Sequence, residues 1–90
     1  YLVKQVKALG GEVRKVQWVG RRGAPDRLVM LPRQMVQGDI WQRSAIWVEL
    51  KAPGKKAESH QVREHARMRA MGQRVVVIDS IEGVDQLLGV

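Results

Sequence analysis

The sequence predicts a small α/β protein in which helices flank one mixed β-sheet, with elements in the order α-β-β-β-α-β-α. Three observations predict this class. Some segments have the apolar spacing of helices, others are rich in β-branched and aromatic residues, and glycine or proline separates most of them. A chain of 90 residues, 44% of them hydrophobic, is expected to form a single domain over residues 1–90.

One helix and two strands are predicted in the first third of the chain. Residues 1–9 carry apolar side chains at helical spacing and end at two glycines, which readily adopt the left-handed conformation common after a helix. Residues 12–19 alternate apolar and polar side chains, the pattern of a half-buried strand. After a loop over 20–25, residues 26–32 predict a more buried strand that ends at Pro32.

The middle of the chain predicts a third strand, reached through a hairpin. Residues 33–44 are the least regular segment, and we interpret them as a hairpin connection that turns at Gly38-Asp39. Residues 45–52 form the clearest strand of the sequence because they are rich in β-forming residues and end at Pro53-Gly54. The three strands are expected to form a meander.

A helix, a strand and a short helix are predicted in the last part of the chain. Residues 58–71 form the longer helix, which begins at Glu58 or Ser59 and ends at a glycine. Residues 74–79 contain an unbroken Val/Ile run, which predicts a strand buried on both faces. A short helix is predicted over 81–88. The helical crossover brings the fourth strand alongside the meander and makes the sheet mixed.

The net charge favours a polyanionic partner. Sixteen Lys and Arg against nine Asp and Glu leave a formal charge of +7, which fits a nucleic-acid binder. The basic residues gather in the first third and the third quarter of the chain, and every charge after Val75 is acidic. A merely soluble basic protein is the alternative that composition leaves open.

Composition also excludes several kinds of protein. The chain has no cysteine, which excludes disulfides and thiolate metal sites and allows a reducing compartment. The longest apolar runs are short, whereas a membrane-spanning helix needs about 20 apolar residues. We therefore expect no membrane partner.

Two acids and a lysine carry the chemistry that the sequence predicts. Side chains alternate along a strand, so Glu49 and Lys51 point to one face and Leu50 to the other. Asp26 heads an earlier strand, and if the two strands pair, Asp26 and Glu49 converge at one end of the sheet. With the Leu50 backbone carbonyl they make an all-oxygen set suited to Mg²⁺ or Mn²⁺. An ammonium beside such a site can orient an attacking water or neutralise developing charge, as hydrolysis of a phosphodiester requires.

A lone Glu-x-Lys triplet is a weak signal, because it usually marks a solvated strand edge or a salt bridge. Its context strengthens the catalytic interpretation. A proline precedes the acid at the head of one strand, the triplet lies in an apolar strand, and a basic helix follows it in a strongly cationic chain.

The motifs together resemble those of a known family. The segments are Gly23-Ala24-Pro25-Asp26, Glu49-Leu50-Lys51 and Ser59-His60-Gln61, and they resemble the virus-type replication-repair nuclease (VRR-NUC) branch of the PD-(D/E)xK nuclease superfamily. The resemblance covers nearly the whole chain and implies a restriction-endonuclease-like core. It further implies that Asp26 and Glu49 are metal ligands, that Lys51 is the water-orienting base or an electrostatic residue, and that Gln61 lines the site.

Several other residues are secondary candidates. Relatives often have an additional acid where this chain has Glu12, which could be a further metal ligand or a solvated acid at a strand start. His65 stands one helical turn after Gln61 and approaches either the site or the DNA, or else serves only in packing. Four basic residues near the motifs are candidates for phosphate contacts: Arg21, Arg22, Lys55 and Lys56.

We therefore expect an Mg²⁺- or Mn²⁺-dependent endonuclease that acts on branched DNA, with four-way (Holliday) junctions as the favoured substrate. A non-catalytic nucleic-acid-binding module, a nuclease for flaps or linear DNA, and an adaptor for an acidic protein are the alternatives. Small relatives of this branch resemble phage or bacterial proteins, so we expect an intracellular location in a bacterial or phage-infected cell. A homodimer is also expected, because the middle segment contains more apolar residues than a solvated connection needs: Met35, Val36, Ile40 and Trp41.

Overall fold

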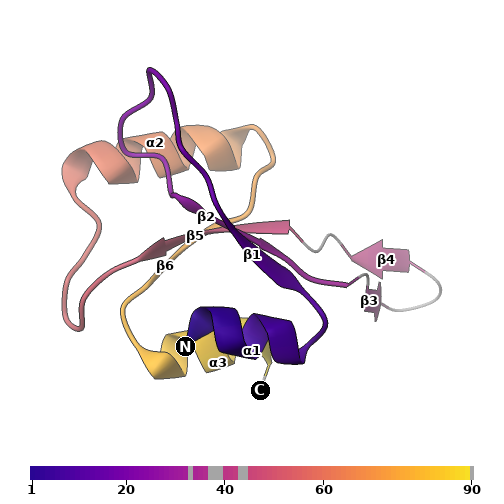
Figure 1. The fold of residues 1–90 in the computed structure, drawn as a ribbon. Coiled ribbons are helices and arrows are strands. Elements are labelled where there is room, and N and C mark those ends of the chain that lie inside the picture. Colours follow the sequence, from indigo (N-terminus) through magenta and orange to yellow (C-terminus); the bar gives the residue numbers. More distant parts are fainter. Residues whose placement is uncertain (33, 37–39, 43–44, 90) are drawn as a thin grey trace.

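The structure is a computed structural model that describes residues 1–32, 34–36, 40–42 and 45–89. It has three layers: a four-stranded sheet lies between α2 on one face and α1 and α3 on the other (Figure 1). The predicted class and order of the elements are confirmed. In chain order the elements are α1 (Leu2–Ala8), β1 (Glu12–Lys15), β2 (Arg27–Met30), β3 (Gln34–Val36), β4 (Ile40–Gln42), β5 (Ala45–Leu50), α2 (Ser59–Ala70), β6 (Val75–Ile78) and α3 (Ile81–Leu88).

The strand order in the sheet is β1-β2-β5-β6. β1 pairs antiparallel with β2, and β2 pairs antiparallel with β5, which confirms the meander. The chain then crosses over through α2 and returns as β6, parallel to β5, with Trp47 beside Val75 and Glu49 beside Val77. The sheet is therefore mixed, because an antiparallel meander is followed by one helical crossover.

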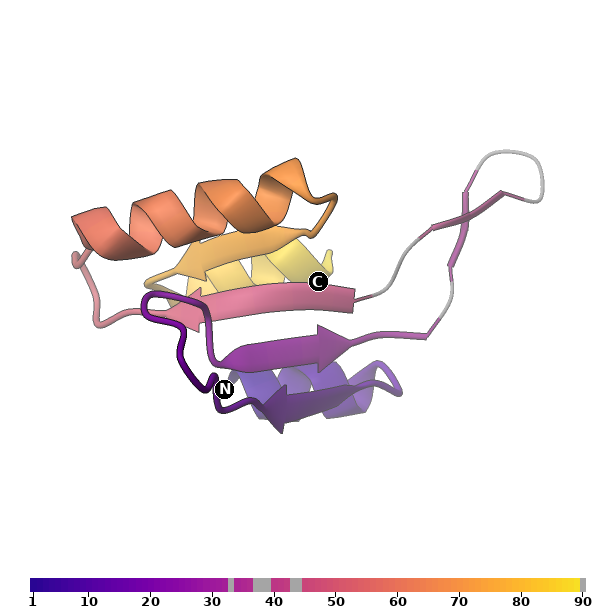
Figure 2. The ribbon, with the colours of Figure 1, turned by 90° about the horizontal axis from the view of Figure 1, so that it is seen from above.

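The segment between β2 and β5 forms a separate two-stranded hairpin of β3 and β4, which extends away from the main sheet (Figure 2). The predicted hairpin is confirmed, with Gln34 opposite Gln42. Its expected turn at Gly38-Asp39 lies outside the described residues. The side chains expected to form a subunit contact lie outside the described part of the structure as well: Met35, Val36, Ile40 and Trp41.

The main apolar core lies between the sheet and the pair α1 and α3. Alternation along β5 sends Ile46 and Val48 to this face, where both are fully buried, and sends Trp47 and Glu49 to the opposite face. The other buried members come from both terminal helices and from the neighbouring strands: Leu2, Val6, Val29, Ile78 and Val84. The second face of the sheet is thereby left for α2 and for polar side chains.

The strand β6 differs from its prediction. Its Val/Ile run predicts burial on both faces, and this is wrong for Val77, whose side chain remains 37% exposed. β6 is an edge strand, and Val77 lies beside Glu49 on the face that α2 covers only in part. The sheet is therefore open to solvent next to Glu49. Among the described residues, no helix is both long enough and apolar enough to cross a membrane.

Candidate active site

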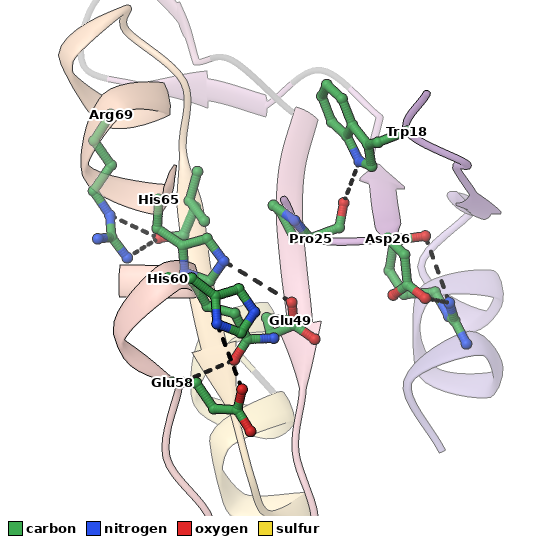
Figure 3. Close-up of polar contacts among 11 residues, drawn as sticks. Trp18, Pro25, Asp26, Glu49, Glu58, His60, His65 and Arg69 are labelled. Carbon is green, nitrogen blue, oxygen red and sulfur yellow. Dashed lines mark hydrogen bonds and ion pairs between the residues drawn. The ribbon is translucent and has the colours of Figure 1, made fainter. Parts of the chain in front are cut away.

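Two strands bring the predicted acids to the same end of the sheet. In the register of β2 and β5, Arg27 lies opposite Val48, so one step further sets Asp26 opposite Glu49. Lys51 is the first residue after β5, and it is near enough to Glu49 for its positive charge to lower the pKa of that carboxyl. The close-up in Figure 3 shows Glu49 on β5 and Asp26 in the neighbouring segment, beside Pro25.

Glu49 lies in an unfavourable environment for a carboxylate. Its side chain is only 14% exposed, and this burial raises its pKa above the usual range. The negative charge of Asp26 raises the pKa of Glu49 further, whereas the nearby cations Lys51 and Arg27 lower it. The two acids and the lysine are thus close enough to interact electrostatically. A cation bound between the acids would relieve their repulsion.

The backbone at Asp26 is fixed from two sides. The Val16 amide donates to the Asp26 carbonyl at 2.8 Å, and the Trp18 indole Nε1 donates to the carbonyl of Pro25 at 2.8 Å. Trp18 also packs on Trp47, with the ring centroids 5.2 Å apart and the planes tilted by 50°. Sequence reasoning missed this role of Trp18. Its position at the end of the first predicted strand gave no sign of the loop that returns beneath it.

The loop before Asp26 is docked on the first turns of α2. Gly23 has a positive φ of 87°, and a Cβ at this position would lie 2.8 Å from the carbonyl oxygen of His60. Any other residue would both strain the backbone and clash with the helix, which explains the glycine of the predicted motif. Two hydrogen bonds from Arg21 to Glu64 tie the same loop to the helix at 3.1 and 3.0 Å.

His65 lies beneath this loop and faces Glu49. Its side chain is 1% exposed, and it makes a backbone hydrogen bond to Gly23. Burial lowers the pKa of His65, and the neighbouring Arg69 lowers it further, so both effects favour the neutral imidazole. Its Nε2 lies 3.9 Å from Glu49 Oε1 (Figure 3). The suggestion that His65 approaches the site therefore agrees with its position, and the packing alternative agrees with its burial.

Glu12 lies away from the two acids, and Gln61 has a structural contact at the start of α2. Glu12 pairs in register with Met30, at the end of β1 away from Asp26, and forms an exposed ion pair with Arg14. Asp26 is four residues from Met30, roughly 13 Å along the strand, so the structure does not bring Glu12 to the pair of acids. Gln61 Oε1 accepts a hydrogen bond from the Glu58 amide at 2.9 Å. This bond completes a capping box, so the described contact of Gln61 is structural.

A basic groove runs beside the docked loop, along the exposed side of α2. Its volume is about 490 Å³. It is lined by four arginines: Arg21 and Arg22 of the loop, and Arg63 and Arg67 of α2. Of these, Arg21 and Arg67 are also paired with Glu64. Sequence reasoning did not single out the two helix arginines, although their spacing of four residues places them on one face. Lys55 and Lys56 lie elsewhere, in the exposed connection between β5 and α2.

The donors at the site fit a hard divalent cation. Among the described residues, no group of three or more His, Cys, Asp and Glu side chains is arranged to hold a metal ion. Asp26 and Glu49 are a pair, however, and Mg²⁺ is commonly bound through one or two carboxylates, with water and substrate phosphate in the remaining positions. The Leu50 carbonyl, at the end of β5, is the further oxygen that the sequence suggests. An all-oxygen pair at an open sheet end suits Mg²⁺ or Mn²⁺ rather than zinc.

Comparison with known proteins agrees with this fold. No protein-family model matches the chain. A protein of Acyrthosiphon pisum secondary endosymbiont phage 1, named "Putative nuclease p44", is 46% identical over 80 residues, which are 89% of this chain and 76% of that protein. A solved structure described as "VRR_NUC domain" superimposes with a TM-score of 0.77 at 40% identity and covers 99% of this chain and 87% of its own.

The fold and the site thus define a protein with a nuclease-type mixed sheet and paired acids at its open end. The similarity extends over 76% of the phage protein and 87% of the solved structure. The chain belongs to the VRR_NUC family.

Proposed function

We propose that this protein is a metal-dependent endonuclease that hydrolyses phosphodiester bonds in branched DNA. The observation that carries the proposal is the register of β2 and β5, which sets Asp26 opposite Glu49 at an open end of the sheet, with Lys51 directly after β5. The family and the name of the phage relative support a nuclease. The positive charge of the chain supports a nucleic-acid substrate.

The carboxylates and the lysine have distinct tasks in this proposal. Asp26 and Glu49, with the Leu50 carbonyl, would hold Mg²⁺ or Mn²⁺. When bound, such an ion supplies positive charge to the phosphate and lowers the pKa of water. The Lys51 ammonium orients the attacking water or stabilises the negative charge that develops on the phosphoryl oxygens. Glu49 stays ionised at neutral pH only at an energetic cost, which a cation offsets.

The DNA backbone is proposed to follow the basic groove beside α2. Arg22, Arg63 and Arg67 present guanidinium groups to phosphates there. Lys55 and Lys56 would contact the same strand or the neighbouring one where it leaves the site. Arg21 contributes indirectly, because its bond to Glu64 fixes the loop from which Arg22 projects.

A four-way junction is the proposed substrate, and a homodimer the proposed assembly. Most homo-oligomers have two-fold symmetry, and a junction has approximately the same symmetry, so a dimer can place two sites on opposed strands. The apolar residues of the β3–β4 hairpin are the candidate contact. The phage source of the relative supports an intracellular setting in a phage-infected bacterium.

The test is a cleavage assay on a four-way junction, a flap and linear duplex, each with and without Mg²⁺. We expect junction cleavage that requires the ion, and loss of cleavage with retained folding for Asp26→Asn, Glu49→Gln and Lys51→Ala. The matched control is Glu12→Gln, which changes an acid at the other end of the sheet and should cut normally. Cleavage at the wild-type rate by any two of the three site variants refutes the assignment.

The same assay separates the remaining candidate functions. Tight binding of junctions without cleavage under any metal would identify a non-catalytic module, and preference for the flap or the linear duplex would correct the substrate. Light scattering at assay concentration tests the assembly. A monomer mass together with full junction cleavage would exclude the dimer.

A further inference from the structure

Among the described side chains, one buried polar atom has no hydrogen-bond partner, and it is Nε2 of His65. The His65 side chain is 1% exposed. A buried polar group that stays unsatisfied destabilises the folded protein. Because Nε2 lies at the edge of the candidate site, we look for a bound molecule that forms the missing hydrogen bond.

The chemistry of that ligand follows from the other nitrogen of the ring. His65 makes a backbone hydrogen bond to Gly23 that favours the protonated ring, so the imidazole is the donor and the carbonyl oxygen accepts. Since Nε2 is the nitrogen without a partner, Nδ1 carries the donated hydrogen. In a neutral ring Nε2 then offers a lone pair. It requires a hydrogen-bond donor.

The group that Nε2 faces cannot be that donor. Glu49 Oε1 lies 3.9 Å away, which is beyond hydrogen-bond distance, and an ionised carboxylate only accepts. A water molecule that donates one hydrogen to each acceptor, at about 2.8 Å, bridges atoms roughly 4 Å apart. Nε2 itself is buried, and the open side of this pair is Glu49, whose side chain is 14% exposed and lies beside the 37% exposed Val77.

We propose that His65 is a positioning residue of the nuclease site, which holds a water molecule between its Nε2 and the Glu49 carboxylate and thereby orients Glu49. This inference rests on the proposed function in that it assigns Glu49 to the reacting centre. The chain of contacts runs from the Gly23 carbonyl through the imidazole and the water to Glu49, and so links the loop of Asp26 to the second acid. Removing a residue that orients a metal ligand typically lowers metal affinity or activity by about 10–100-fold.

Two substitutions of His65 distinguish its two contacts, the water bound at Nε2 and the hydrogen bond that anchors the ring to the Gly23 carbonyl. In His65→Asn the side-chain amide nitrogen can still donate to Gly23, but no acceptor reaches the position of Nε2. In His65→Gln the longer side chain places an amide oxygen near that position and loses the anchor. The matched control is His60→Asn on the same helix, where the imidazole is paired with Glu58 at 3.5 Å and not with Glu49 (Figure 3).

We expect His65→Asn to fold and to lose about 10–100-fold both in kcat on junction DNA and in Mn²⁺ affinity measured without DNA. His65→Gln should recover part of both. His60→Asn, whose side chain lines the groove beside α2, should keep the wild-type Mn²⁺ affinity measured without DNA. Wild-type Mn²⁺ affinity and kcat in a folded His65→Asn would overturn the inference, since the ring would then serve in packing alone.

A spectroscopic readout is independent of cleavage. In ¹⁵N-labelled protein at pH 7.5 we expect the His65 ring in the Nδ1–H tautomer, with Nε2 unprotonated and its resonance shifted when Mg²⁺ is added. A hydrogen on Nε2, or a resonance that Mg²⁺ leaves in place, would overturn the inference. If the wild type cuts no DNA, the proposed function fails, and the Mn²⁺ affinities and the ring resonances still decide the role of His65.

Discussion

Arg21 and Glu64 are joined by two hydrogen bonds, from Nε to Oε2 at 3.1 Å and from Nη2 to Oε1 at 3.0 Å, although 43 residues separate them in the chain. Glu64 is followed by His65, which holds the carbonyl of Gly23. These two neighbours are the buried polar residues of the described structure, and both hold the loop that leads to Asp26. The geometry of the site therefore depends on one turn of α2.

Arg21→Ala should destabilise the protein more than Arg22→Ala. The Arg21 variant leaves the Glu64 carboxylate, which is 9% exposed, without its bidentate partner, at a cost of about 1–3 kcal/mol. Arg22 is exposed in the same loop, and Arg22→Ala removes the same charge, so this variant is the control. Urea unfolding of both variants measures the difference. Equal midpoints would show that the bidentate pair contributes nothing to stability.

Glu49→Gln should be more stable than the wild type at pH 7.5. The pKa of Glu49 is raised in the folded protein, so its ionised form costs stability above that pKa, and the cost disappears as the pH falls through it. The gain in the variant should accordingly shrink towards acid pH. The measurement is the difference in melting temperature between the variant and the wild type at several pH values from 7.5 to 4. Glu12→Gln, at an exposed acid, is the control. A variant less stable than the wild type at neutral pH contradicts the expectation.

Stability should fall below about pH 6.5 because of His65. Its pKa is lowered on folding, so the unfolded chain takes up the proton first and the folded state loses stability as the pH drops below the unfolded value. The loss is at most about 1.4 kcal/mol per pH unit. Denaturant midpoints at pH 7.5 and 5.5 should separate by less in His65→Asn, which lacks the titrating ring. If the midpoints at the two pH values differ as much in His65→Asn as in the wild type, the loss of stability at low pH is due to another titrating group.

DNA affinity should depend on the groove beside α2 and on salt. Removing Arg22 and Arg63 together should weaken binding of any sequence, and each lost phosphate contact should reduce the log–log salt slope by about 0.9 on duplex DNA. The control carries the same change of charge on the opposite layer, at Lys4 and Lys7 of α1, which are exposed. Fluorescence anisotropy across salt concentrations measures both. If removing Lys4 and Lys7 weakens DNA binding more than removing Arg22 and Arg63, the DNA binds on the face covered by α1 instead.

Local patterns predicted much of this protein. Alternation placed Glu49 and Lys51 on one face, and the order of strands and helices followed from spacing and from glycine and proline positions. These features depend on residues that are close in the sequence, so they can be predicted from one sequence without a structure. The motif at Gly23 also had a local cause, since a positive φ requires glycine there.

Only the tertiary structure decided which side chains meet. The register of β1 removed Glu12 from the site, and a helix cap took the oxygen of Gln61. Packing of the loop on α2 turned Arg21 from a phosphate contact into the partner of Glu64 and buried His65 against Glu49. The sequence by itself determined the elements and the candidate acids, because these depend on local backbone preferences. Pairing between residues some 40 positions apart depends on how layers pack, and no local pattern encodes it.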